Sequence, residues 1–164
     1  MAAQTLDMHS VSPASLSDIP QLVGLLNLLF TQETDFAPDP ARQERALRLI
    51  LAQPEIGRIF CARADGRIIG MVSLLFSIST VKGGRVAWLE DMVVQPEWRS
   101  RGVGESLLKH ALERARAFNC SRVTLLTDET NTAGKRFYER AGFVRSQMVP
   151  FRLHLDFSAR KSGG

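Results

Sequence analysis

Residues 93–104 read VVQPEWRSRGVG: the end of an apolar strand, a turn that contains two glycines, and the start of a helix. The first backbone N–H groups of a helix have no partner inside the helix and lie at the positive end of its dipole. Gly102 and Gly104 lack the Cβ atoms that would hold an anion away from those amides. The stretch therefore predicts a phosphate-binding site.

This turn fits neither of two common nucleotide-binding patterns. A P-loop needs GxxxxGK[ST], and no Lys-Ser/Thr pair stands here; a dinucleotide fingerprint needs GxGxxG, and position 107 is leucine. What remains is Arg-x-x-Gly-x-Gly, from Arg99 to Gly104, between a strand and a helix. The other interpretation of a lone GxG is an ordinary turn.

The elements around the turn are predicted from the spacing of apolar residues. The helix from Gly102 to Phe118 has one apolar stripe with its charged residues largely off it. Before the turn, strands 58–63, 68–78 and 86–94 form an antiparallel meander joined by hairpin turns at Asp65-Gly66 and at Lys82-Gly83-Gly84. The remaining predicted elements are strands 8–11, 122–127, 143–144 and 148–155, and helices 19–30, 41–52 and 132–141.

These elements predict one α+β domain, residues 1–157, with helices on both faces of a central mixed sheet, followed by a flexible tail, residues 158–164. The chain has 164 residues, 45% of them apolar and 23% charged, which is typical of a soluble globular protein. The first helix is expected to start at a capping box, Ser15-x-x-Asp18. Leu25 and Leu28 widen its apolar stripe beyond one face, which predicts that the helix is covered on two sides. The second cover is either a substrate lid or a homodimer partner.

Charge and cysteine content narrow the class of protein. The net charge of +4 is compatible with RNA, an anionic membrane or a polyphosphate ligand, and also with a solvated basic face. No aromatic-basic cluster of the kind that binds single strands is present, so we expect no nucleic acid partner. Cys61 and Cys120 have no metal-ligand spacing, so we expect reduced thiols and no metal site. Without a signal sequence, and with the apolar stretch Leu22–Phe30 too short for a membrane, we expect a cytoplasmic protein.

Two carboxylates, Glu90 and Asp91, lie in the middle of the apolar strand 86–94. Carboxylates are costly in a half-buried strand unless they are paired or functional. Strand alternation places the two on opposite faces, so one faces a ligand cleft. The alternative for each residue is an ion pair with a neighbouring arginine.

A second motif follows about thirty residues later, Asn131-x-x-Gly134-x-x-Phe137-Tyr138, ending at Gly142-Phe143. Asn131 occupies the N-cap position of the predicted helix, and Gly142 its αL C-cap. Tyr138 is either a core aromatic residue with a solvated hydroxyl or a functional phenol. Together with the Arg99–Gly104 turn, this motif resembles the GNAT superfamily of acetyl-CoA-dependent N-acetyltransferases, over most of the chain.

The resemblance implies the GNAT-like fold, a mostly antiparallel twisted sheet whose fourth strand splays from the fifth, and acetyl-CoA as the cofactor, released as coenzyme A. In that family the backbone amides of the turn hold the pyrophosphate, and the end of the fourth strand pairs with the pantetheine arm. The cofactor-binding residues implied here are Met92, Val93, Val94, Arg99, Ser100, Arg101, Gly102, Val103, Gly104, Glu105 and Asn131. We expect the Glu105 carboxylate to point away from the phosphates.

The implied reaction is direct transfer of the acetyl group to a primary amine of a small molecule or peptide. A protonated amine must lose a proton before it attacks, and Glu90 is the candidate general base, with Asp91 next. A backbone N–H near Met92 is expected to stabilise the oxyanion, and Tyr138 to protonate the departing thiolate.

Other functions are compatible with the same residues. The chain is alternatively an acyl-CoA-binding sensor or partner-binding module without turnover. For the acceptor, Glu33, Asp35 and Asp39 either attract a cationic amine or are solvated loop charges. Phe36, Met148 and Phe151 either line an apolar wall or simply pack.

Overall fold

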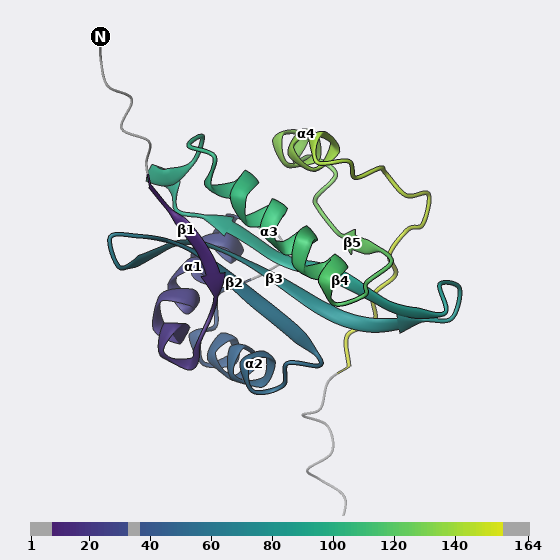
Figure 1. The fold of residues 1–164 in the computed structure, drawn as a ribbon, viewed down its shortest axis with the longest axis horizontal. Helices are drawn as coiled ribbons and strands as arrows, with labels where there is room; N and C mark the ends of the chain where they lie inside the picture. The colour runs from purple at the N-terminus through teal and green to yellow at the C-terminus, as the bar shows by residue number, and fades with distance from the viewer. Residues whose placement is uncertain (1–7, 33–36, 156–164) are drawn as a thin grey trace, which may run out of the picture. The chain divides into compact units, whose positions relative to one another are not determined.

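The computed structural model describes residues 8–32 and 37–155 (Figure 1). The chain divides into two compact units, one ending at Leu126 and the other beginning at Thr127. The single domain expected over residues 1–157 therefore stays a proposal. The part of the chain that is described contains no helix long and apolar enough to cross a membrane.

The first unit is built on a five-stranded sheet with the order β1-β2-β3-β4-β5. Neighbouring strands are antiparallel, except β4 and β5, which are parallel. This confirms the predicted mixed, mostly antiparallel sheet, and the Asp65-Gly66 turn has the positive φ values predicted for it. The strands are β1 (Ser10–Pro13), β2 (Gly57–Ala64), β3 (Arg67–Ser79), β4 (Gly84–Val94) and β5 (Val123–Leu125).

Helices cover both faces of this sheet, as predicted. Figure 1 shows α1 (Ile19–Gln32) and α2 (Pro40–Ala52) on one face and α3 (Val103–Ala117) on the other. Alternation along β2 explains the division, because successive side chains point to opposite faces. Ile59 packs with the α1 and α2 residues of the core, whereas the Phe60 ring meets the His110 ring of α3 edge-on at 4.8 Å.

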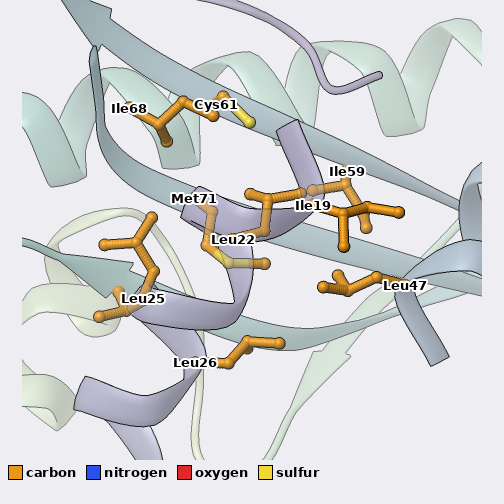
Figure 2. Packing of buried hydrophobic residues seen from close by; sticks show 10 residues of the cluster. Ile19, Leu22, Leu25, Leu26, Leu47, Ile59, Cys61, Ile68 and Met71 are labelled. Atoms are coloured by element: carbon orange, nitrogen blue, oxygen red, sulfur yellow. The ribbon is translucent and has the colours of Figure 1, made fainter. Parts of the chain in front are cut away.

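The core between α1, α2 and the sheet is formed by apolar side chains that are at most 5% exposed (Figure 2). Full burial of each such side chain is worth about 1.5–3 kcal/mol, so this cluster anchors β3 and β4 firmly against α1. Leu25 belongs to this core, while Leu28 remains 36% exposed. The cluster comprises Ile19, Leu22, Leu25, Leu26, Leu47, Ile59, Cys61, Ile68, Met71 and Val93.

The start of α1 is fixed to the sheet by a buried carboxylate. Asp18 accepts hydrogen bonds from the Ser15 N–H at 2.7 Å and from the Arg63 guanidinium at 3.0 and 2.8 Å. The bond from the Ser15 N–H to the Asp18 side chain is one of the two hydrogen bonds of the predicted capping box. The Arg63 hydrogen bonds lower the pKa of Asp18 to about 2, so this anchor is charged throughout the physiological range.

The two cysteines are unpaired, as expected. Cys61 is fully buried between β1 and β3, and this burial raises the pKa of its thiol to about 12. Within residues 8–32 and 37–155, no three His, Cys, Asp or Glu side chains gather as a metal ion would require.

The second unit contains α4 (Thr132–Arg140), which begins at the predicted residue and ends one residue before the predicted end, Ala141. Gly142 follows α4 with a φ of 96°, and the Phe143 N–H donates to the Tyr138 carbonyl oxygen at 3.1 Å. The strands predicted at 143–144 and 148–155 are wrong, because residues 143–155 form no strand. Their alternating apolar side chains remain exposed, 96% for Phe151 and 83% for Leu153. Among the described residues, no strand supplies the packing that such a pattern needs.

Candidate active site

The turn before α3 has the conformation that its glycine permits. Gly102 is the N-cap of α3, with a left-handed φ of 77°, and Ser100 also has a positive φ of 58°. Because glycine has no side chain, this cap leaves the amides of the first α3 turn without the side-chain acceptor that serine or aspartate would supply. A Cβ at Gly102 would meet no protein atom within 4 Å, so the space beside these amides is open.

The two arginines of the turn both have partners within the protein. The Arg99 Nε donates to the Val94 carbonyl oxygen at 3.1 Å, and the Arg101 guanidinium lies 5.3 Å from the centre of the Trp98 ring. Both arginines and Glu105 are exposed. The turn therefore combines a helix N-terminus that no side chain caps with two exposed positive side chains, which are features that favour an anion.

A β-bulge separates the two halves of β4. Val72 pairs with Met92 and Leu74 with Leu89, so Glu90 and Asp91 together face the single β3 residue Ser73. A bulge of this kind interrupts strand alternation. The argument that alternation places Glu90 and Asp91 on opposite faces therefore does not apply, and Asp91 points to Ser73, whose Oγ lies 3.0 Å from its Oδ2.

Beyond the bulge, one edge of β4 is paired with no strand of the described chain. Its pairing with β5 covers only Ala87 to Leu89, so residues 90–94 have no β5 partner. This is the splay expected between the fourth and fifth strands.

The hydrogen-bond pattern shows which backbone groups face this open edge. The Gln95 N–H bonds the Ile69 carbonyl oxygen at 2.9 Å, which makes this pair a hydrogen-bonded one. Such pairs alternate along an antiparallel ladder, so Val93 turns its backbone groups to β3 while Met92 and Val94 turn theirs to the open edge. Consistently, the Val94 carbonyl oxygen accepts the Arg99 Nε outside the ladder.

The two carboxyl groups of the bulge have different surroundings. Glu90 is exposed, whereas Asp91 is largely buried. Burial raises the pKa of Asp91 to about 6; the Ser73 hydrogen bond opposes this rise, and the negative charge of Glu90 adds to it. A carboxyl group with a pKa near the working pH is suited to accept and release a proton.

In the second unit, Asn131 has the role of an N-cap. Its Oδ1 accepts from the Gly134 N–H at 3.0 Å, and its Nδ2 donates to the Thr127 Oγ1 at 3.1 Å. A Cβ at Gly134 would lie 2.3 Å from the Asn131 Nδ2, so glycine at this position lets the amide fold over the helix. A cofactor contact by Asn131 stays a prediction.

Tyr138 lies half-buried on α4 between two aromatic rings. The Phe137 and Phe143 rings meet it edge-on at 5.2 and 5.7 Å. Burial raises the pKa of Tyr138 to about 12, so the phenol keeps its proton over the whole physiological range.

The residues considered for binding the acceptor amine do not form one group in the structure. Glu33, Asp35 and Phe36 lie outside the described residues. Asp39 caps α2 by accepting from the Arg42 N–H at 3.1 Å and pairs with the Arg42 side chain, which makes it a structural carboxylate. Met148 is 86% exposed.

Two residues that position the site were missed by sequence reasoning. Ser73 contacts Asp91 from β3, and the Gln95 side-chain amide donates to the Ile68 carbonyl oxygen at 3.0 Å, where β4 ends. Ser73 is a polar residue in a long apolar run, which is the signal that would have singled it out.

Comparisons with known proteins show a family of enzymes that this chain resembles. The model of the acetyltransferase (GNAT) family matches residues 22–143. Glucosamine 6-phosphate N-acetyltransferase of Trypanosoma brucei brucei is 36% identical over 61% of this chain and 66% of its own length, just under two thirds. Glucosamine 6-phosphate N-acetyltransferase 1 of Oryza sativa subsp. japonica is 28% identical over 87% of this chain and 85% of its own.

A solved structure, a putative acetyltransferase from Agrobacterium tumefaciens, is similar over 89% of this chain and 99% of its own, with 30% identity and a TM-score of 0.75. The family match covers most of the chain and includes the α3 turn, the β4 bulge and α4. The chain therefore belongs to the GNAT family, the class of acetyl-CoA-dependent N-acetyltransferases.

Proposed function

We propose that the first turn of α3 and the open edge of β4 hold acetyl-CoA and present its acetyl group to a primary amine. Two observations together carry this proposal. The N-cap of α3 is Gly102, which has no side chain, and the pairing of β4 with β5 ends at Leu89, so the rest of the β4 edge is open. The amides of residues 99–105 suit a pyrophosphate, and the outward-turned backbone groups of Met92 and Val94 suit an arm that contains amides. When bound, acetyl-CoA supplies the thioester carbonyl that the amine attacks.

In the proposed reaction, side chains of the protein accept and donate the protons that acetyl transfer requires. Asp91 takes a proton from the acceptor ammonium group, directly or through one water, and frees the lone pair that forms the new N–C bond. The Met92 N–H donates to the carbonyl oxygen as negative charge develops there. As the bond to sulfur breaks, Tyr138 gives its proton to the departing thiolate. The acceptor nitrogen, which the new N–C bond makes acidic, loses its second proton, and this proton returns through water to Tyr138. We rank Asp91 ahead of Glu90 as the base because burial raises the Asp91 pKa to about 6.

For the acceptor we propose a small amine, with glucosamine 6-phosphate the first to test. The support is that two relatives, 36% and 28% identical, are named for that substrate. A polyamine has less support, because Asp39, one of the acidic residues that would attract it, is engaged at the α2 cap.

The first prediction is that acetyl-CoA, but neither NAD nor ATP, raises the melting temperature. A ligand at a hundred times its dissociation constant stabilises the fold by about 2.7 kcal/mol. For a domain of this length that corresponds to roughly 5–11 °C. No shift at millimolar acetyl-CoA would mean that the Arg99–Gly104 turn holds no cofactor.

Turnover separates the enzyme from a sensor or partner-binding module. We expect thiol release from acetyl-CoA in the presence of glucosamine 6-phosphate and none with glucose 6-phosphate, which lacks the amine. A polyamine and a peptide with a free N-terminus are assayed in parallel. A thermal shift without turnover of any of these amines would favour the binding module.

A further inference from the structure

Ser73 is an unusual residue in the centre of β3. It is 1% exposed, and its neighbours Val72 and Leu74 are completely buried and apolar. A buried hydroxyl costs free energy unless both its donor and its acceptor capacity are used. Its partners therefore indicate what it does.

Both capacities of the Ser73 hydroxyl are directed at one residue. The Ser73 Oγ donates to the Asp91 Oδ2 at 3.0 Å and accepts from the Asp91 N–H at 3.0 Å. The direction of the first bond follows from chemistry, because an ionised carboxylate only accepts. The hydroxyl thus takes the place of a ladder hydrogen bond that the bulge interrupts, and ties the Asp91 backbone and side chain together to β3.

We propose that Ser73 is the positioning residue of this active site: it fixes the β4 bulge, and thereby the direction of the Asp91 carboxyl group and of the adjacent Met92 N–H. This inference rests on the proposed acetyl transfer. Ser73 itself touches neither substrate nor cofactor and acts through Asp91.

Apart from the Ser73 hydroxyl, which is uncharged, few groups change the pKa of Asp91. Glu90, on its own strand, is the one charged residue of the described chain whose field contributes to the raised Asp91 pKa. Helix α1 packs against β4 and carries no ionisable side chain, β5 carries none, and β3 carries only Arg67. On α3 the ionisable residues are Glu105, Lys109, His110, Glu113, Arg114 and Arg116, and none contributes to the shift. Ser73 is therefore the chief group that favours the ionised carboxylate.

Removing the hydroxyl has a defined consequence. In Ser73→Ala the Asp91 carboxylate loses a hydrogen bond to its charged form, so its pKa rises and the acidic limb of the kcat/KM profile moves to higher pH. Loss of one hydrogen bond to an ionised group raises this pKa by about one to two units, so the ionised fraction of Asp91, and with it kcat at pH 7, falls by about two- to tenfold. The KM for acetyl-CoA changes less than kcat, because the α3 turn proposed for the pyrophosphate is untouched.

The experiment compares Ser73→Ala with Ser73→Thr, which keeps the hydroxyl, and with Ser77→Ala, an exposed serine on the same strand. Ser73→Cys, which nearly keeps the side-chain shape, replaces Ser73→Ala if that variant does not fold. Two readouts are taken on the full chain: the Asp91 carboxyl titration by 13C NMR, and the pH dependence of kcat and KM with the best acceptor.

The expected result is an Asp91 titration, and a matching acidic limb, at higher pH in Ser73→Ala. Ser77→Ala should behave as wild type, and Ser73→Thr, which keeps the hydroxyl, should restore the wild-type pH of the Asp91 titration. An Asp91 titration in Ser73→Ala that equals that of wild type would overturn the inference. So would an equal loss of activity at every pH, since a purely structural role gives that pattern. If no amine is turned over, acetyl transfer fails, but the titration still decides the role of Ser73.

Discussion

Replacing Asp91 with asparagine is expected to make the protein more stable at pH 7 and nearly inactive. In the folded chain the Asp91 pKa is raised from 3.8 to about 6. Protonated Asp91 thus favours folding, a stabilisation that is fully present below pH 3.8 and is lost as the pH rises through 6. The shift is about two units, each worth about 1.4 kcal/mol, so the ionised carboxylate costs about 2–3 kcal/mol at pH 7.

The Asp91→Asn variant avoids this cost because its amide is uncharged. We expect its melting temperature to exceed that of wild type by roughly 5–10 °C at pH 7, and by little at pH 3.5, where wild-type Asp91 is protonated in both states. Loss of a general base lowers kcat/KM by about 10²–10⁴-fold. Lower stability than wild type at pH 7, or unchanged turnover, would contradict the assignment.

Glu90→Gln is the matched control, since it removes the neighbouring charge and keeps Asp91. That charge adds to the raised Asp91 pKa, so the variant should retain turnover and shift its acidic limb to lower pH. If Glu90→Gln is the inactive variant and Asp91→Asn the active one, Glu90 is the base, as the sequence-based ranking had it.

Tyr138→Phe is expected to lower kcat by about 100-fold, the size of a typical general-acid contribution. With a pKa of about 12, the phenol is protonated throughout pH 6–10, so the loss should be the same across that range. The KM for the acceptor should change little, because the hydroxyl acts when the thiolate departs.

Packing around Tyr138 needs its own control. Phe143→Leu removes a ring 5.7 Å from the Tyr138 ring and leaves the hydroxyl in place, so we expect a smaller loss of kcat. Full turnover in Tyr138→Phe over the whole pH range would show that the thiolate leaves without this acid.

Local patterns in the sequence were sufficient to predict the sheet, the three helices that cover it and the α3 turn. Each depends on neighbours along the chain, such as the apolar stripe of α3 or the Asp65-Gly66 turn. The bulge at Glu90 and Asp91 was beyond such reasoning, since it exists only relative to β3, where Ser73 faces both residues. Alternation assumes an unbroken register, and one inserted residue invalidates it.

The C-terminal strands were mispredicted for a related reason. Alternating apolar residues at 149, 151, 153 and 155 are compatible with a strand, but a strand needs a partner to satisfy its backbone and cover its apolar face. Asp39 is a different case: its hydrogen bond with the Arg42 N–H, three residues later, makes it a helix cap, and Asp followed by Pro40 is the local sequence signal for that role.

The most direct test of the account is to map coenzyme A on the protein by 1H–15N NMR. We predict that the largest shifts fall on the amides of residues 99–105 and of Met92 and Val94, and that the hairpin amides of Asp65 and Gly66 stay unmoved. Shifts concentrated elsewhere, or none at saturating coenzyme A, would contradict the claim that the α3 turn and the open edge of β4 form the cofactor site.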